Sequence, residues 1–471
     1  MKMFVAGEWI DKTERIEVHN PFDGSVVDTV PKADERDIEK ALAAAVEGAR
    51  IMATLPGYER YKILHKASEL MTERQDRLGR LISTEEGKIL AEGVFEASRA
   101  QQTIELSAEE AKRLTGEVLP LDGAPGGAGK LGFTLRVPCG VVVAITPFNF
   151  PLNLVCHKVG PALAAGNAVI LKPASDTPLS ALSLVEILLE AGLPPLAISC
   201  LTGSGSLIGD ALCSDRRVRK ISFTGSCGIG EHICKVAGLK KVTMELGSNS
   251  PLIVLEDADL AKVADVAVAN GFSNAGQVCI SAQRVIALPR AYGNLIDALK
   301  PKVEAMFVGN QLDQKTKMGP MIREADAKRV SEWIGEAVQS GAKLVAGGHR
   351  QGTLHEATLL ADVLPEMKVS RQELFGPAVV MTRAADIDEA IALANDSQYG
   401  LAAGLFTQNL DWAIKYARQV DCGNLHINWG PQWRADLMPY GGLKESGLGR
   451  EGPKYAVQEM SEYKTVVIHG V

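Results

Sequence analysis

The segment Val141-Val-Val-Ala-Ile145-Thr-Pro-Phe-Asn149-Phe-Pro151 begins with an apolar run and leads into a helical pattern over residues 154–165. Three further apolar runs, at residues 168–171, 198–201 and 218–223, follow it and are separated by helical stretches. Strands that alternate with helices are typical of a doubly wound parallel sheet. In such sheets ligands bind at the carboxyl ends of the strands. The pattern therefore predicts an α/β fold with a ligand site beyond these strand ends.

A second α/β series runs from Leu252-Ile-Val-Leu255 to the apolar segment 401–406. Because 471 residues are too many for one core, two doubly wound α/β domains with a cleft between them are expected. Residues 34–114 have a helical period but no recognisable chemistry. The Gly- and Pro-rich segment 116–138 ends in a strand-like run, and such a segment often crosses to another domain or subunit.

Composition excludes several classes of protein. A net charge of −7 argues against a nucleic-acid partner, which requires a basic patch. No apolar run approaches the ~18 residues of a membrane span, and Glu8 comes too early for a signal peptide. The eight cysteines contain no Cys-x-x-Cys pair, so neither a metal site nor a disulfide framework is expected. These features favour a cytoplasmic protein with reduced thiols and no membrane partner.

Two glycine-rich loops compete as phosphate sites. The loop Gly203-Ser-Gly205-Ser-Leu-Ile-Gly209 and the loop Phe223-Thr-Gly225-Ser226-Cys-Gly-Ile-Gly230 each precede a helical pattern. Unpaired N–H groups and the helix dipole favour an anion at such a position. A tight strand-to-helix turn is the alternative for each loop. Lys172 follows a strand and either reaches a ribose hydroxyl or is simply solvated.

Gly276-Gln-Val-Cys279 places one cysteine in a loop before the apolar segment 283–288. A lone cysteine more often acts as a small buried hydrophobe than as a nucleophile. Its immediate neighbours alone leave both interpretations open.

Seven motifs occur in series, and together they carry a resemblance. They are Thr146-Pro-Phe-Asn149-Phe-Pro151, Lys172-Pro-Ala-Ser175, Phe223-Thr-Gly-Ser226, Glu245-Leu-Gly-Ser-Asn-Ser-Pro251, Gly276-Gln-Val-Cys279, Glu373-Leu-Phe-Gly-Pro377 and Pro439-Tyr-Gly-Gly-Leu-Lys-Glu-Ser-Gly447. In this order and spacing the chain resembles the NAD(P)-dependent aldehyde dehydrogenase superfamily over nearly its whole length.

The resemblance implies a division of the chain into three parts. Residues 1–115 and 139–247 correspond to a Rossmann-like NAD(P)-binding domain, and residues 248–454 to the catalytic domain. Residues 116–138 and 455–471 correspond to a small β oligomerisation element. Because its strands would expose edges in a monomer, a homodimer or homotetramer is expected.

The resemblance also assigns the catalytic roles. Cys279 becomes the nucleophile, because a thiolate adds to a carbonyl and leaves a thioester that water can cleave. The side-chain amide of Asn149 and the backbone N–H of Cys279 become the oxyanion donors. Glu245 becomes the general base for hydrolysis. Acyl-transferring relatives that use coenzyme A generally lack this glutamate, so its presence favours a free acid as product.

For the cofactor, NAD or NADP, the resemblance assigns Lys172 to the adenosine ribose. Gly225 and Ser226 are assigned to the pyrophosphate, Glu373 to the nicotinamide ribose and Phe375 to the ring, and the Gly203 loop becomes a neighbour of the adenine side. The remaining expected cofactor residues are Thr146, Ser175, Gly205 and Phe223. Where the family often has a glutamate that repels the 2′-phosphate of NADP, this chain has Ser175, followed by Asp176. We therefore expect NADP to be at least tolerated.

For the substrate, the chain looks most like lactaldehyde dehydrogenases, with succinic semialdehyde dehydrogenases as the neighbouring group. A small, polar aldehyde is expected, with a succinic semialdehyde or phosphorylated aldehyde as the alternative. A further alternative is a catalytically retired member with a structural or binding role, although Cys279, Glu245 and Asn149 are all present. The residues expected at the substrate are Phe150, His157, Val278, Ile280, Trp433 and Arg434. For Arg434, a surface or interface ion pair is an equal alternative.

Overall fold

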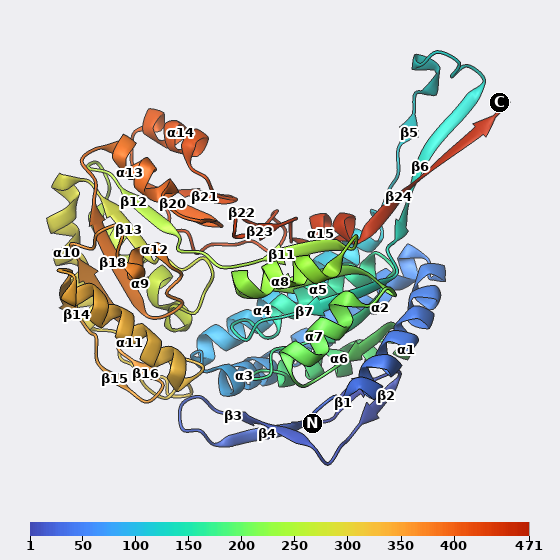
Figure 1. Cartoon of the computed structure of the whole chain (residues 1–471), viewed down its shortest axis with the longest axis horizontal. Helices are drawn as coiled ribbons and strands as arrows, with labels where there is room; N and C mark the ends of the chain where they lie inside the picture. The colour runs from blue at the N-terminus through green and yellow to red at the C-terminus, as the bar shows by residue number, and fades with distance from the viewer. Residues whose placement is uncertain (471) are drawn as a thin grey trace.

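The computed structural model describes residues 1–470 and contains two α/β bodies and a projecting arm (Figure 1). The first body is built on an eight-stranded sheet in the order β2-β1-β9-β8-β7-β10-β11-β23. Its strands are β1 (Met3–Val5), β2 (Glu8–Ile10), β7 (Val141–Ile145), β8 (Ala168–Lys172), β9 (Ile198–Cys200), β10 (Val218–Thr224), β11 (Lys241–Glu245) and β23 (Gly447–Leu448).

The central strands of this sheet, from β9 to β11, are parallel. Alternate side chains of β8 enter two different apolar cores, with Val169 and Leu171 in one and Ala168 and Ile170 in the other. Because successive side chains of a strand point to opposite faces, both faces of the sheet are covered. This is the doubly wound arrangement that the alternating pattern predicts.

Helices cover the two faces of this first sheet. They are α1 (Glu35–Thr54), α2 (Gly57–Glu73), α3 (Gln75–Glu86), α4 (Leu90–Ala111), α5 (Asn153–Ala164), α6 (Leu179–Glu190), α7 (Gly205–Ser214), α8 (Cys227–Ala237) and α15 (Pro453–Glu459). The helical segment predicted over residues 34–114 thus becomes α1 to α4. Helix α4 packs against both α3 and α5, and α3 and α4 lie on the side of the first body that faces the second (Figure 1).

The second body is built on a seven-stranded sheet in the order β14-β17-β18-β13-β12-β20-β21. Its strands are β12 (Pro251–Val254), β13 (Arg284–Ala287), β14 (Lys343–Ala346), β17 (Thr358–Ala361), β18 (Ala378–Arg383), β20 (Ala402–Phe406) and β21 (Asn424–Ile427). Its helices are α9 (Leu260–Phe272), α10 (Pro289–Glu304), α11 (Glu324–Gln339), α12 (Lys368–Arg371), α13 (Ile387–Asn395) and α14 (Leu410–Gln419). The two predicted α/β domains are therefore confirmed.

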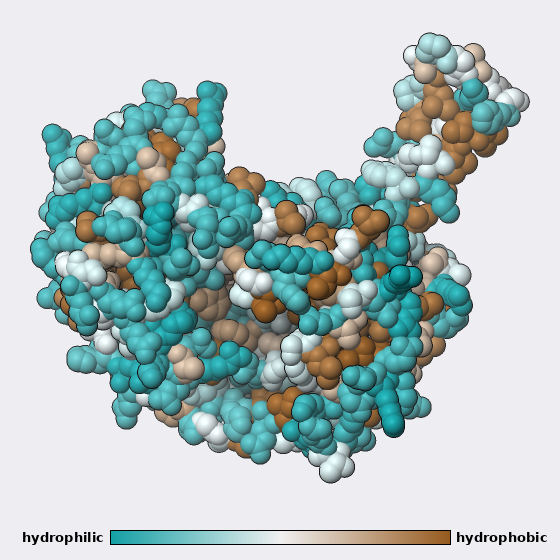
Figure 2. All heavy atoms as spheres, viewed as in Figure 1, coloured by the Kyte–Doolittle hydropathy of each residue, from teal (hydrophilic) through white to brown (hydrophobic). Residues whose placement is uncertain are grey.

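The arm is a three-stranded sheet of β24 (Ser461–His469), β6 (Lys130–Pro138) and β5 (Val118–Leu119). Strands β24 and β6 pair along nine residues, from Ser461 opposite Pro138 to His469 opposite Lys130. The arm projects from the first body (Figure 1), and apolar side chains gather on it (Figure 2). Its exposed apolar side chains are Val118, Leu131, Leu135, Tyr463, Val467 and Ile468.

Three short strand pairs and three 3-10 turns complete the fold. The pairs are β3 (Arg15–His19) with β4 (Val26–Pro31), β15 (Arg350–Gln351) with β16 (Leu354–His355), and β19 (Tyr399–Gly400) with β22 (Leu443–Lys444). The turns are η1 (Leu121–Gly123), η2 (Pro195–Ala197) and η3 (Ser273–Gly276). Over residues 1–470, no helix combines the length and the apolarity that crossing a membrane requires.

Candidate active site

A cavity of about 630 Å³ is lined by residues of both bodies at the carboxyl ends of β10 and β11. Register explains the position, because Ile145 pairs with Phe223 and Thr224 pairs with Glu245, so the three parallel strands end together. Twelve of the predicted site residues line the cavity: Asn149, Phe150, Gly225, Ser226, Glu245, Val278, Cys279, Ile280, Glu373, Phe375, Trp433 and Arg434.

Cys279 lies in a tight loop after α9 and η3. Asn274 and Ala275 have left-handed backbones with φ of 50° and 52°, and Gly276 follows with φ of 69°. A Cβ atom on Gly276 would lie 2.1 Å from the carbonyl oxygen of Gly376. The close approach of these two chains therefore requires glycine in the motif.

The thiol of Cys279 lies 3.2 Å from the hydroxyl oxygen of Tyr440. Burial raises the pKa of Cys279 to about 12, the Tyr440 hydroxyl opposes that rise, and the carboxyl groups of Glu373 and Glu245 add to it. The resting side chain is thus a thiol, and Tyr440 can donate to the sulfur when the thiolate forms.

Asn149 follows β7 and points toward the cysteine loop. Its Nδ2 donates to the backbone oxygen of Gln277 at 2.9 Å, and its buried Oδ1 has no partner within the described residues. Since Gln277 is two residues before Cys279, the side-chain amide of Asn149 lies close to the backbone of Cys279.

Glu245 ends β11 and presents two buried carboxyl oxygens without hydrogen-bond partners in the described chain. Burial and the nearby carboxyl group of Glu451 raise the pKa of Glu245 well above its ordinary value, while Arg434 opposes the rise. Such a desolvated carboxyl group can exchange protons at physiological pH.

Beside Tyr440, Arg434 contacts three groups. Its Nη2 lies 3.1 Å from Nδ1 of His157 and 3.4 Å from Glu451, and its guanidinium lies 3.9 Å from the centre of the Tyr440 ring. Its Nε is buried and has no partner among residues 1–470. One donor of this arginine is therefore available to a ligand.

His157 does not reach the cavity, because it is fully buried behind Arg434. Its Nε2 lies 2.8 Å from Asp436, and burial together with the charge of Arg434 lowers its pKa to about 4. The imidazole is then neutral, and it accepts a hydrogen bond from Arg434 while donating one to Asp436. Arg99 completes this chain with hydrogen bonds of 2.7 and 3.1 Å to Asp436.

Several features fit a dinucleotide along the ends of β7, β8 and β10. The first turn of α8 has no side-chain cap after Ser226, which leaves N–H groups for a pyrophosphate. The buried hydroxyls of Thr146 and Thr224 have no partners in the part of the chain described. Glu373 accepts a hydrogen bond of 2.8 Å from the Ser248 amide, and burial raises its pKa to about 7.

The other expected cofactor residues lie outside this cavity: Thr146, Lys172, Ser175, Gly205 and Phe223. Burial lowers the pKa of Lys172 to about 8, and its Nζ donates to the carbonyl oxygen of Pro173 at 2.8 Å. The hydroxyl of Ser175 donates to the carbonyl oxygen of Gly203 at 2.9 Å, which brings the segment after Lys172 and the Gly203 loop together. Within residues 1–470, no cluster of His, Cys, Asp or Glu is arranged to hold a metal ion.

The fold and this site define an aldehyde dehydrogenase: the model of the aldehyde dehydrogenase family matches residues 9–466, and the chain belongs to that family. It is 48% identical over 467 residues to a 3-sulfolactaldehyde dehydrogenase of Priestia aryabhattai, covering 99% of this chain and 98% of the relative. It is 40% identical over 473 residues to a lactaldehyde dehydrogenase of Methanococcus maripaludis, covering all of both chains.

A solved structure of an NADP-dependent glyceraldehyde-3-phosphate dehydrogenase from Bacillus halodurans, in complex with NADP, superimposes with a TM-score of 0.97. The two chains are 37% identical, and the match covers 100% of this chain and 99% of the Bacillus halodurans protein. The predicted family, fold class, oxidoreductase activity on aldehydes and use of NAD or NADP are thereby confirmed.

Sequence reasoning missed several residues that border the cavity. They are Arg99, Asn153, Gln432, Tyr440 and Glu451. Tyr440 is part of the motif that begins at Pro439, so that motif is the signal from which it could have been found. Arg99 lies in the helical segment to which no chemistry was assigned.

Replacing Tyr440 by Phe removes one hydroxyl and preserves the ring. Loss of a hydrogen bond to a charged group costs about 1.5–3 kcal/mol, so the thiolate of Cys279 should become at least about tenfold scarcer at fixed pH. Alkylation of Cys279 by iodoacetamide, followed by peptide mass mapping across pH, should slow by that factor. Tyr416→Phe is the matched control, since Tyr416 is also fully buried but lies on α14. An unchanged alkylation rate in Tyr440→Phe would contradict this role.

Proposed function

We propose that the protein oxidises a small polar aldehyde to its carboxylic acid through a thioester on Cys279. The observation that carries this proposal is the meeting of Cys279, Asn149 and Glu245 around one cavity. The presence of all three argues against a retired, non-catalytic member.

In the proposed mechanism the Cys279 thiolate adds to the aldehyde carbon, and the carbonyl oxygen becomes an oxyanion. The Asn149 amide and the Cys279 backbone N–H donate to that oxyanion. When bound, NAD(P)+ would accept the hydride that leaves the carbon of this tetrahedral adduct, and the loss of the hydride turns the adduct into the thioester. Glu245 then removes a proton from water, the hydroxide attacks the thioester, and the acid leaves as the thiolate is restored.

Cofactor positioning follows from the groups at the strand ends. Gly225 and Ser226 open the first turn of α8 for the pyrophosphate, and Lys172 serves the adenosine ribose. Glu373 serves the nicotinamide ribose, and Phe375 borders the ring.

Exchange of Glu245 for Gln should separate the two half-reactions. Acylation proceeds without the base, so one equivalent of NAD(P)H should form rapidly per active site, while steady-state turnover falls by about 10²-fold or more. Stopped-flow absorbance at 340 nm measures both phases. Cys279→Ala should show neither phase. Full steady-state turnover in Glu245→Gln would contradict the role of Glu245.

The charged groups around Arg434 support an anionic tail on the aldehyde. Arg99, Arg434 and Lys158 are cationic there, whereas Glu451 and Asp436 carry the opposing charges. Burial opposes ionisation of Glu451, but Lys158 and Arg434 outweigh it and lower its pKa to about 2. With His157 neutral, one positive charge is in excess, and the free Nε of Arg434 can donate to the anion.

The substrate proposed is therefore a short 2-hydroxyaldehyde of the lactaldehyde type with a carboxylate, sulfonate or phosphate tail. Trp433 and Phe150 supply apolar walls, and His157 holds Arg434 from behind. Succinic semialdehyde is the alternative within the same class of anionic aldehydes.

Arg434→Gln should lower kcat/KM for 3-sulfolactaldehyde and succinic semialdehyde at least about tenfold more than for neutral lactaldehyde. The effect on charged aldehydes must be compared with the effect on lactaldehyde, because Arg434 also faces Cys279 and Glu245. Its loss therefore slows the oxidation of every substrate. Equal effects on charged and neutral aldehydes would exclude Arg434 as the anion partner.

The same panel, assayed with both cofactors, tests the expectation for NADP. Asp176 forms a bidentate ion pair with Arg323, with 3.0 Å between Arg323 Nε and the carboxylate. This pairing offsets the charge that would repel a 2′-phosphate, which supports tolerance of NADP. Strict rejection of NADP would contradict it.

We further propose the three-part division given above, a cytoplasmic location consistent with eight free thiols, and a homodimer or homotetramer. The outer edge of β24 has no strand beside it within residues 1–470, and unpaired edges favour pairing with another chain.

Tyr463→Lys/Val467→Lys places two charges on the arm and should shift the oligomer to a smaller species in size-exclusion chromatography with light scattering. Leu239→Lys is the control, since Leu239 is fully exposed but lies outside the arm. An unchanged mass in the double variant, or a monomeric native chain, would contradict the role of the arm.

A further inference from the structure

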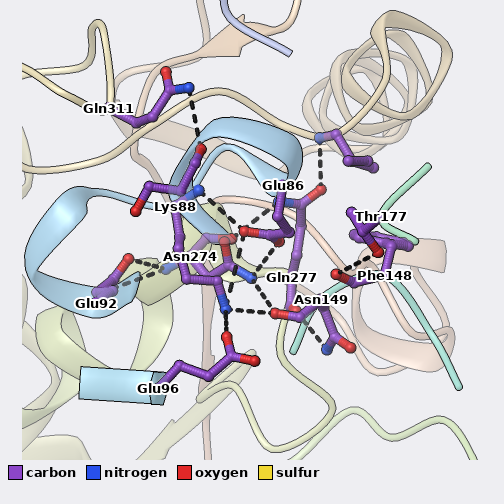
Figure 3. A network of polar contacts seen from close by, with 12 residues as sticks. Glu86, Lys88, Glu92, Glu96, Phe148, Asn149, Thr177, Asn274, Gln277 and Gln311 are labelled. Carbon is purple, nitrogen blue, oxygen red and sulfur yellow. Dashed lines mark hydrogen bonds and ion pairs between the residues drawn. The ribbon is translucent and has the colours of Figure 1, made fainter. Parts of the chain in front are cut away.

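The junction of α3 and α4 contains a buried group of charges that the mechanism has not used (Figure 3). Glu86, Lys88 and Glu96 are exposed by 0%, 1% and 2%, respectively. They lie in the helical segment to which the sequence assigned no chemistry. Glu92, which accepts from the Ser273 hydroxyl and the Asn274 amide, belongs to the same network.

Lys88 contacts the asparagine loop directly. Its Nζ donates to the carbonyl oxygen of Asn149 at 2.6 Å and to Glu96 at 2.6 Å, and it lies 4.0 Å from the centre of the Phe150 ring. An ammonium group has three donors, and here two donate to oxygens while the cation faces an aromatic ring. The Asn149–Phe150 peptide is thus held on one side by a single charged group.

Glu96 holds the next part of the same loop. One of its carboxyl oxygens bonds Lys88, and the other accepts from the backbone amides of Leu152 and Asn153 at 2.9 and 3.1 Å. These amides open α5, where unpaired N–H groups favour an anion. The Lys88–Glu96 pair therefore fixes the segment between the end of β7 and the start of α5.

The cysteine loop is tied to the same group of charges. Asn274 donates through Nδ2 to Glu86 at 2.8 Å and to the carbonyl oxygen of Asn149 at 3.3 Å. Its own carbonyl oxygen accepts from the backbone and side-chain amides of Gln277. Asn149 Nδ2 in turn donates to Gln277. The carbonyl of Asn149 is therefore shared by Lys88 and the loop that carries Cys279.

The burial of these charges has an energetic cost. Moving charges from water into a protein interior costs several kcal/mol per ion, and apolar replacement of a buried ion pair is often neutral or stabilising. Packing alone would be served by a methionine at position 88. A geometric requirement at Asn149 explains why a lysine occupies this place.

We propose that Lys88, paired with Glu96, is a positioning residue that fixes the amide of Asn149 for the oxyanion. This inference rests on the proposed function, in which Asn149 is the side-chain donor. Lys88 acts by holding the Asn149 carbonyl, and a displaced amide loses transition-state stabilisation without loss of substrate binding.

A double-mutant cycle tests the inference with Lys88→Met, Asn149→Ala and the double variant in the full-length protein. Lys88→Met should lower kcat between about 10- and 100-fold with little change in KM for aldehyde. In the Asn149→Ala background, the same change should have almost no further effect on kcat, because the two residues act as one unit. Circular dichroism and thermal unfolding measure the folded fraction of each variant.

Two further variants guard against a loss of folding. Lys88→Met/Glu96→Gln removes both buried charges but keeps an oxygen that can accept from the α5 amides, and it should show the same fall in kcat. Lys220→Met is the matched control, because Lys220 is also buried and donates to Thr243 at 2.6 Å away from Asn149. It should lower stability while kcat per folded protein stays the same.

The outcomes separate the two proposals. If Asn149→Ala leaves kcat unchanged, the proposed oxyanion role fails, and the inference about Lys88 falls with it. If Asn149→Ala lowers kcat but Lys88→Met does not, only the inference about Lys88 fails. It also fails alone if the two effects multiply in the double variant, or if Lys220→Met lowers kcat as much as Lys88→Met.

Discussion

The hydrogen-bond register of the parallel strands β7, β10 and β11 is the constraint on which the site depends. Each pairs with its neighbour so that all three end at the same level. A slip of one residue would turn every side chain to the opposite face, and both faces are buried in apolar cores. Asn149, the Gly225 loop and Glu245 therefore share one edge because the packing of the sheet fixes the register.

At that edge of the sheet, the surroundings of two glutamate side chains shift their pKa values in opposite directions. Glu245 and Glu451 both border the cavity. The carboxyl group of Glu245 has no hydrogen-bond partner within the described residues, and burial raises its pKa. The carboxyl group of Glu451 is also buried, but Lys158 lies 2.7 Å from it and lowers its pKa. Two carboxyl groups with separated pKa values are characteristic of acid–base sites. Glu451 supplies the fixed charge, and Glu245 is the group that can take up and release a proton.

Much of the fold and of this site could be predicted from the sequence, since apolar runs and helical periods depend on local spacing. The motif residues Asn149, Glu245 and Cys279 meet at one cavity as the family pattern implies. His157 could not be placed by spacing, because its side chain lies behind Arg434, which comes from a loop 277 residues later. The role of Lys88 was hidden for the same reason, since its partner atom is a backbone carbonyl that side-chain types do not reveal.

Cys279, the proposed nucleophile, shows why position, and not acidity, identifies a candidate functional group here. Burial raises the pKa of all eight cysteines, including Cys156 and Cys200 in the core. A raised pKa therefore fails to distinguish Cys279 from inert thiols. What sets Cys279 apart is that it borders the cavity, where Tyr440 and Arg434 both favour its thiolate form against burial. Cys279 therefore rests as a thiol, and the hydrogen bond from Tyr440 and the charge of Arg434 favour formation of its thiolate.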